Sequence, residues 1–360
     1  MRNSLLLFHR WVALVTSVLI LVVAVTGSAL VFEGAMDRGL NPHLWRVTPG
    51  SHPLSLDSLA AHASSAVGAP VTGFSLSLDP GRAWVGTIRG GQVFVDPYSG
   101  AVLGKRTGSE FARTLPALLH ALHTSLMKEG VGSTVVALVT LAALLLTLTG
   151  VVIWWRDNRW QVRWSASWKR IVFDLHHSLG IMASLVLFIV TASGMALHYE
   201  VAGRMIAKLD ATPRAELPNQ PAGAPGSSTI SLDSLAHVAR RALPGASITF
   251  FSLPPKATQP FIVAMRFPED RTPGGRSRVS VDRFRGTLLA VRDTRDAGTG
   301  TALNNMMRSL HTGDILGKPT EVVWLLAALV LASQSVSGFL MWWNGRAARA
   351  ALARSSRLAP

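Results

Sequence analysis

Four long apolar stretches divide the chain into alternating membrane-like and polar segments. They are Trp11–Phe32, Thr134–Trp155, Leu179–Leu197 and Val322–Trp343, and none contains a charged residue. Each is close to the roughly 20 residues that a helix needs to cross the hydrocarbon core of a bilayer. The first stretch ends without the small-residue motif of a signal-peptidase site, so we expect it to remain as an anchor. The pattern predicts an integral membrane α-helical protein built on a four-helix bundle.

The segments that follow the first and third stretches share a second pattern. The helix-like start SLDSLA occurs at 55–60 and again at 231–236, and its first serine is a typical helix cap. Alternating runs typical of strands follow at Phe74–Leu78, Ala83–Ile88, Thr249–Leu253 and Phe261–Phe267, and each copy closes with a hairpin-like sequence. We therefore predict two small α+β modules outside the membrane. A Pro-, Ala- and Gly-rich stretch at 212–228 predicts a linker.

Histidines recur at matching places in the two halves of the chain. Each lies at a fixed distance before a glycine that follows a serine or threonine. Small residues of this kind favour close helix approach, and they would also make room for a flat macrocycle. The spacing is 18 positions from His9 to Gly27 and from His176 to Gly194, and 27 from His123 to Gly150 and from His311 to Gly338.

This internal duplication divides the chain into eight consecutive segments. The first half contains an N-terminal segment with span one (1–32), an outer module (33–118), and a histidine-bearing re-entry with span two (119–155). A basic linker (156–175) leads to the second half, which contains span three (176–199), a second outer module (200–305), a histidine-bearing re-entry with span four (306–343) and a basic tail (344–360).

Basic residues next to the spans predict the orientation. Arginine and lysine concentrate in the N-terminus, in the linker between spans two and three, and in the tail, so these three segments should be cytoplasmic. The protein is then expected to be a multi-pass membrane protein with both ends in the cytoplasm and the two modules outside. The net charge of +15 is largely explained by this topology, and no soluble basic face indicates a nucleic-acid partner.

The chain contains no cysteine. Disulfides, thiolate-ligated iron–sulfur clusters and thioether-attached haem are therefore excluded. The sequence also lacks a glycine fingerprint for a dinucleotide between a strand and a helix. Any dinucleotide-binding domain would therefore have to belong to a separate partner.

The short motifs around the histidines resemble those of the PepSY-associated transmembrane helix family. They are His9-Arg10-Trp11 before span one, Asp174-Leu175-His176 before span three, and Leu122-His123-Thr124 and Leu310-His311-Thr312 before spans two and four. The resemblance covers nearly the whole chain and implies that the outer modules are PepSY domains. It also implies an iron-regulated inner-membrane protein similar to the haem-bearing reductases that release iron from ferrisiderophores in the periplasm.

The resemblance implies haem, and the paired histidines are its candidate axial ligands. A bis-imidazole haem takes one ligand from each side, so a bundle must present single histidines from two facing helices at the same depth. His9 and His176 lie just before spans on the predicted cytoplasmic side, whereas His123 and His311 precede spans on the outer side. We therefore expect two b-type haems, with His9 opposite His176 and His123 opposite His311. Glycines at 129–132 and 312–317 would let the outer segments fold back.

His198 breaks this symmetry because Val31 occupies the matching place. It lies 22 residues after His176, which would put both on one helical face about 40° and roughly 33 Å apart. His198 is an alternative outer ligand in place of His123 or His311, or a residue of the substrate site. Arg10 and Arg308 are candidate partners for haem propionates, since a guanidinium matches a carboxylate. Extension toward lipid headgroups is the alternative for Arg10.

Together these features lead us to expect a haem-dependent ferric-siderophore reductase. Reduction loosens the chelate, because hard oxygen ligands hold Fe(III) better than Fe(II). Two other readings remain open at this stage. A membrane scaffold could use its PepSY modules to restrain a periplasmic partner such as a protease, and its histidines would then be interfacial polar residues. A siderophore permease would need polar residues along its spans, and the spans lack charge.

Overall fold

The computed structural model describes residues 2–108, 110, 114–158, 160–210, 229–253 and 259–358. The chain forms two compact units. We call the first, residues 1–33, 118–203 and 307–360, the helical unit, and the second, residues 34–117 and 204–306, the sheet unit. All of the predicted spans and candidate ligands belong to the helical unit.

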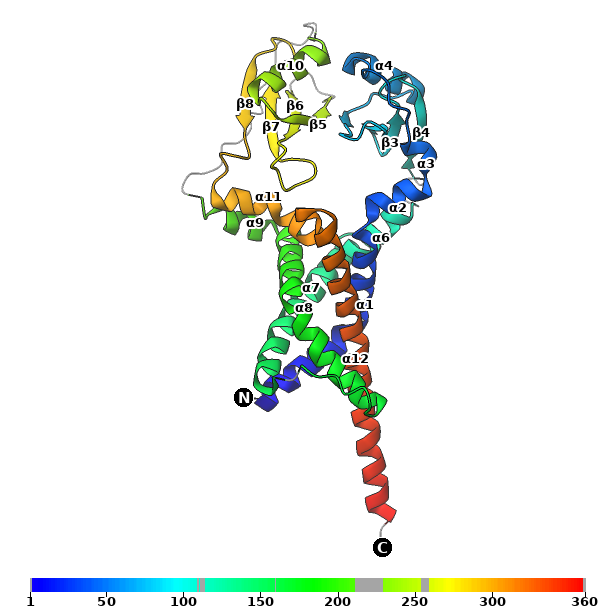
Figure 1. Ribbon diagram of the computed structural model, residues 1–360, viewed down its shortest axis with the longest axis vertical. Coiled ribbons are helices and arrows are strands. Elements are labelled where there is room, and N and C mark those ends of the chain that lie inside the picture. Colours follow the sequence, from blue (N-terminus) through cyan, green and yellow to red (C-terminus); the bar gives the residue numbers. More distant parts are fainter. Residues whose placement is uncertain are drawn as a thin grey trace. The chain divides into compact units, whose positions relative to one another are not determined.

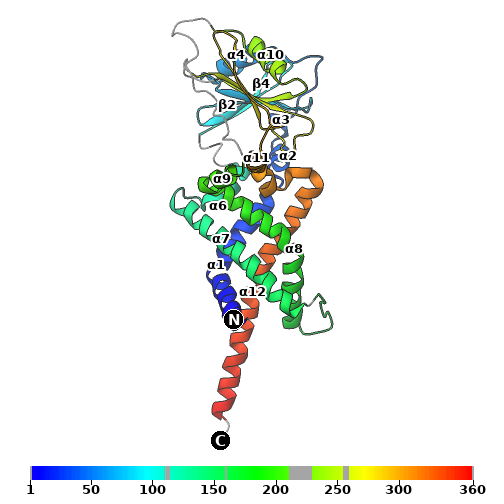
Figure 2. The same ribbon diagram turned by 90° about the vertical axis from the view of Figure 1, so that its left-hand side faces the viewer.

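Four long helices run side by side in the helical unit (Figures 1 and 2). They are α1 (Arg2–Leu30), α7 (Val131–Asp157), α8 (Trp168–His198) and α12 (Lys318–Leu358). Each contains a stretch long and apolar enough to cross a membrane, which confirms the four predicted spans. Helices α7 and α12 each pack against both α1 and α8. Since α1 and α8 share these neighbours, they stand diagonally opposite one another in a closed ring.

Two shorter helices, α6 (Leu115–Ser125) and α11 (Thr299–Thr312), carry His123 and His311 ahead of α7 and α12. The chain turns sharply after each of them. Gly313 and Gly317 adopt left-handed φ values of 82° and 77° around a short 3₁₀ turn, η1 (Asp314–Leu316). At Gly313 a side chain would also strike Trp324, so glycine is required there on two counts.

The predicted basic linker is shorter than expected. α8 begins at Trp168, inside the segment 156–175 that the sequence assigned to the linker. An ion pair between Arg170 and Asp174, one turn apart at 2.8 Å, favours this extra helical turn. Asp174 also accepts a hydrogen bond from the backbone N–H of Arg163 at 3.2 Å, which closes the linker against α8.

The sheet unit is built around one antiparallel sheet with the strand order β4-β3-β2-β1-β5-β6-β7-β8. Its strands are β1 (Gly73–Ser75), β2 (Trp84–Ile88), β3 (Gly91–Val95), β4 (Val102–Thr107), β5 (Ser247–Ser252), β6 (Phe261–Arg266), β7 (Ser277–Val281) and β8 (Leu288–Arg292). The sequence predicted two modules, and the structure joins their strands through β1 and β5. Pairing the inner edges leaves two exposed edges instead of four.

Among the described residues, five further helices lie in or border the sheet unit. They are α2 (Glu33–Leu40), α3 (Pro42–Trp45), α4 (Leu56–Val67), α9 (Glu200–Ala207) and α10 (Leu232–Ala242). The repeated SLDSLA sequences start α4 and α10, as predicted, with Ser55 and Ser231 accepting the capping hydrogen bonds. The predicted linker at 212–228 lies outside the described residues.

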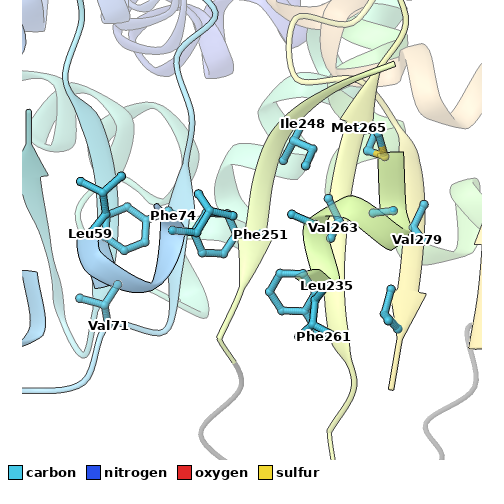
Figure 3. Close-up of a cluster of buried hydrophobic side chains, with 14 of the residues drawn as sticks. Leu59, Val71, Phe74, Leu235, Ile248, Phe251, Phe261, Val263, Met265 and Val279 are labelled. Atoms are coloured by element: carbon cyan, nitrogen blue, oxygen red, sulfur yellow. The ribbon is translucent and has the colours of Figure 1, made fainter. Parts of the chain in front are cut away.

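One hydrophobic core spans both halves of the sheet unit (Figure 3). Phe74 of β1 and Phe251 of β5 are register partners with ring centroids 5.5 Å apart, and both are fully buried. Leu59 of α4 and Leu235 of α10 pack into the same core. The shared core explains why the two halves form one sheet, because each half alone would expose these side chains to water.

Two aspartates tie the halves together reciprocally. Asp233, which begins α10, accepts a hydrogen bond from the N–H of Leu56 at the start of α4 (3.2 Å). Asp57, in the matching place on α4, accepts from the N–H of Leu232 (3.1 Å) and of Asp233 (3.4 Å). Each carboxylate satisfies an amide that has no partner within its own helix and adds favourable charge at that helix N-terminus.

Replacing either aspartate should therefore loosen the other helix. In Asp57→Ala, amide exchange at Leu232 should accelerate about fivefold, since a lost cap costs roughly 1 kcal/mol. Asp233→Ala should act in the same way on Leu56. Hydrogen exchange with mass spectrometry resolves the two peptides, and exposed Glu269→Ala is the control. Equal acceleration at both helices in both variants would contradict the reciprocal arrangement.

Candidate functional site

His9 and His176 line one cavity of about 770 Å³ inside the helical unit. They come from α1 and α8, the diagonally opposed helices. The cavity is enclosed by all four long helices, and much of its lining is apolar, with Leu14, Ile20, Leu146, Leu187 and Leu331 among its residues. We call His9 and His176 the first pair.

Each histidine of the first pair is held by a hydroxyl on a neighbouring helix. His9 Nδ1 lies 2.8 Å from Thr149 Oγ1 of α7, and His176 Nδ1 lies 2.8 Å from Ser337 Oγ of α12. Both hydroxyls donate to carbonyls of their own helices, Thr149 to Leu145 (2.8 Å) and Ser337 to Ser333 (2.7 Å). A hydroxyl has only one proton to donate, so when that proton is on the helix carbonyl the hydroxyl oxygen accepts from the histidine. In this arrangement Nδ1 carries the proton in both rings.

His123 and His311 form a second pair, and their ring centroids lie 6.1 Å apart. His123 Nδ1 donates to the carbonyl oxygen of Val23 on α1, and His311 Nδ1 donates to that of Val190 on α8, each at 2.9 Å. A carbonyl can only accept, so here too Nδ1 carries the proton. In neutral imidazoles of this tautomer Nε2 keeps its lone pair, the form that binds a metal.

The glycine of each Ser/Thr–Gly pair lies beside one histidine ring. A Cβ placed at Gly27 would come within 2.8 Å of His123 Cε1, and one at Gly194 within 3.0 Å of His311 Cε1. At Gly150 and Gly338 the corresponding distances, to His9 and His176, are 3.6 and 3.5 Å. The repeated small residues thus make room for imidazoles, and the contact is tight at the second pair and ordinary at the first.

The second pair is neutral at physiological pH. Burial lowers the pKa of His123 from 6.5 to about 4, and the proximity of His311 lowers it further. Burial also lowers the pKa of His311, and the charge of Arg308 acts in the same direction. Both rings therefore present an unprotonated Nε2 without first having to lose a proton.

The two pairs lie toward opposite ends of the bundle. His9 is near the start of α1, whereas the second pair meets α1 at Val23 and Gly27. A helix rises about 1.5 Å per residue, so roughly 25 Å separate these levels. The four histidines are therefore divided between two levels of the bundle.

A family model described as the PepSY-associated TM region matches residues 6–344. The chain belongs to this family. The resemblance inferred from the histidine motifs is thereby confirmed, and the protein is a multi-pass membrane protein. A comparison with curated proteins gives no match.

Other predicted site residues of this PepSY-associated chain lie apart from the pairs or at their margins. His198 is exposed at the end of α8, where its ring meets Tyr199 edge-on at 4.8 Å, so the fold does not bring it to the second pair. Arg10 lines the cavity, with its guanidinium 5.8 Å from the ring centroid of Trp11. Arg308 is exposed one turn before His311 on α11.

Two further polar residues, His177 and Gln334, line the cavity. His177 lines it beside His176, but its Nδ1 lies 3.0 Å from the carbonyl of Phe173 in its own helix. Gln334 also lines it, and Gln334 Nε2 is a buried atom without a hydrogen-bond partner among the described residues. The sequence does offer a signal for Gln334, because it is an amide side chain among the small and apolar residues of the fourth span. An unpaired buried donor beside a cavity fits a space that an additional molecule fills.

The four histidines of the helical unit's two pairs lie two by two, His9 with His176 and His123 with His311. Across the part of the chain that the structure describes, no three His, Asp or Glu side chains come together as they would to hold a bare metal ion. Two opposed imidazoles leave the remaining positions around a metal to a planar ligand, as in haem proteins.

The glycine contacts predict unequal effects of added methyl groups. Gly27→Ala should force His123 out of place and destabilise the helical unit by roughly 1–3 kcal/mol, the usual cost of overpacking. Gly150→Ala should be tolerated, because its new Cβ would meet His9 at an ordinary contact distance. Thermal unfolding in detergent measures both. Equal destabilisation would show that the glycine at the second pair has no special role.

The buried second pair also predicts a pH dependence for the ligand-free protein. Between pH 6.5 and about 4, the unfolded chain binds a proton at His123 that the folded chain does not. Stability should therefore fall as the pH falls from 7 to 5.

Replacing both rings, in His123→Gln/His311→Gln, should flatten this dependence, and His198→Gln should leave it unchanged because that ring is exposed. Thermal unfolding at several pH values provides the test. An unaltered slope in the double variant would contradict neutral burial of the pair.

Proposed function

We propose that this PepSY-associated protein carries two b-type haems through the membrane and reduces a ferric siderophore in the periplasm. The observation that carries the proposal is the set of four paired histidines, each with Nδ1 bonded and Nε2 free. The absence of cysteine excludes thioether attachment, which is consistent with b-type haem.

The spacing of the second pair fits a bis-imidazole centre. Two metal–nitrogen bonds of about 2 Å, with about 1 Å from each nitrogen to its ring centre, put the ring centroids roughly 6 Å apart. The centroids of His123 and His311 are 6.1 Å apart. These two rings could therefore bind one iron from opposite sides with little movement.

The first pair differs because an open space already separates its helices. The cavity of about 770 Å³ falls within the usual range for cofactor sites, and its walls are largely apolar. His9 and His176 would supply the axial nitrogens from opposite helices. Arg10 at the cavity would hold a propionate, and the apolar lining would keep water from the macrocycle.

Haem bound at these two levels would supply one-electron redox chemistry on each side of the bilayer. The protein's own contribution is to keep the four imidazoles neutral, oriented and dry. The substrate iron gains one electron and changes from Fe(III) to Fe(II), which the hard oxygen ligands of a siderophore hold less well. The electron would come from a separate donor, a quinol or a cytoplasmic reductase, and the protein would sit in the inner membrane with its sheet unit in the periplasm.

Haem content tests this proposal directly. Wild-type protein purified from haem-replete cells should bind two haems per chain and show a sharpened Soret band and resolved visible bands on reduction with dithionite. His9→Ala or His176→Ala should remove one haem, and His123→Ala or His311→Ala the other. Dithionite-reduced wild type should be reoxidised by a ferric siderophore.

His198→Ala is the matched control, since this exposed histidine should leave both haems in place. Loss of a haem in His198→Ala would show that His198 is an axial ligand after all. Colourless wild-type protein would contradict the proposal and favour a membrane scaffold whose sheet unit binds a periplasmic partner.

A further inference from the structure

The four histidines are held by two different kinds of acceptor. Side-chain hydroxyls of Thr149 and Ser337 hold the first pair, and backbone carbonyls of Val23 and Val190 hold the second. Every one of these contacts lies at or within one turn of a Ser/Thr–Gly pair. The Ser/Thr–Gly pairs therefore have different relations to the histidines at the two levels of the bundle. At the first pair the hydroxyl itself contacts Nδ1, and at the second pair a carbonyl one turn earlier makes the shorter contact.

Ser337 and Ser193 show the difference most clearly, because both precede a glycine that faces a histidine. Ser337 Oγ accepts from His176 Nδ1 at 2.8 Å. Ser193 Oγ instead donates to carbonyls of its own helix, at 2.6 Å to Ile189 and 3.0 Å to Val190. His311 Nδ1 donates to the backbone carbonyl of Val190 and not to the Ser193 hydroxyl.

We propose that Thr149 and Ser337 are positioning residues that set the tautomer and the electron density of His9 and His176, while Ser193 has no such role toward His311. This inference rests on the proposed function, because it concerns the ligands of the first centre. A partner at Nδ1 fixes the ring orientation and makes the ligating nitrogen a stronger donor to iron. At the second pair the shorter contacts are to backbone carbonyls, which side-chain substitution cannot remove: Val23 and Val190 each lie 2.9 Å from Nδ1, and the Thr26 hydroxyl lies 3.3 Å from His123 Nδ1.

The structure also explains why the hydroxyls are suited to this task. Each hydroxyl donates its single proton to a carbonyl of its own helix, so only its oxygen lone pairs remain to accept from the imidazole. With its proton on that carbonyl, the hydroxyl faces the imidazole as an acceptor. The ring is consequently held as the Nδ1–H tautomer.

Removing the hydroxyls should alter the first centre alone. In Thr149→Val and in Ser337→Ala, haem affinity at that centre should fall about tenfold, the lower end of the range for such partners. The midpoint potential of the first centre should rise, since a weaker imidazole donor stabilises Fe(III) less. The second centre should keep its potential and its occupancy.

Ser193→Ala is the matched control and should leave both centres as in wild type, because His311 keeps the Val190 carbonyl. Thr149→Ser and Ser337→Thr should restore wild-type values, since each retains the hydroxyl that its counterpart half already uses. Loss of both haems in Ser337→Ala with recovery in Ser337→Thr would still assign the role to the hydroxyl.

The measurements are haem titration and a spectroscopic redox titration of the full-length protein in detergent, with His9→Ala identifying the step that belongs to the first centre. Two haems in wild type with no change in Ser337→Ala and Thr149→Val would overturn this inference and leave the proposed function intact. The same change in Ser193→Ala as in Ser337→Ala would also overturn it. Wild type without haem would overturn both.

Discussion

The hydrogen bond from a histidine Nδ1 to an acceptor on a neighbouring helix is the interaction around which the helical unit is arranged. It occurs four times, and each time the ring edge lies beside a glycine. A neutral imidazole in an apolar bundle needs such a partner, because an unpaired buried N–H costs free energy. The bond satisfies that need with one nitrogen and leaves the other for chemistry. Glycine then permits the approach that the bond requires.

The repeated sequence pattern also shapes the structure, because matching residues of the two halves of the chain lie close together in space. The closed ring of four helices sets α1 opposite α8, so the matched histidines His9 and His176 reach the same cavity. In the sheet unit, β1 pairs with β5 and each of Asp57 and Asp233 caps the helix of the other half. Both units use their two copies reciprocally, so neither half is complete alone.

The symmetry is broken where the proposed chemistry would differ. The first pair opens onto a large cavity, whereas the rings of the second pair already lie 6.1 Å apart. At the cavity, the buried Nε2 of Gln334 has no hydrogen-bond partner among the described residues. Such departures follow from local sequence changes in an otherwise repeated frame. They show how two centres of similar ligand type can have different surroundings and hence different properties.

The sequence by itself determined the four spans, the capped helix starts, the strands and the four histidines, because hydropathy and repeated spacing depend on local residues alone. It also identified the family. Only the tertiary structure decided that the modules share one sheet, that His198 stays exposed, and that Thr149 and Ser337 bond to imidazoles. Those outcomes depend on which helix or strand edge becomes the neighbour of which. All of the repeated Ser/Thr–Gly hydroxyls donate to carbonyls of their own helices, and only packing decides that those of Thr149 and Ser337 also lie 2.8 Å from a histidine Nδ1.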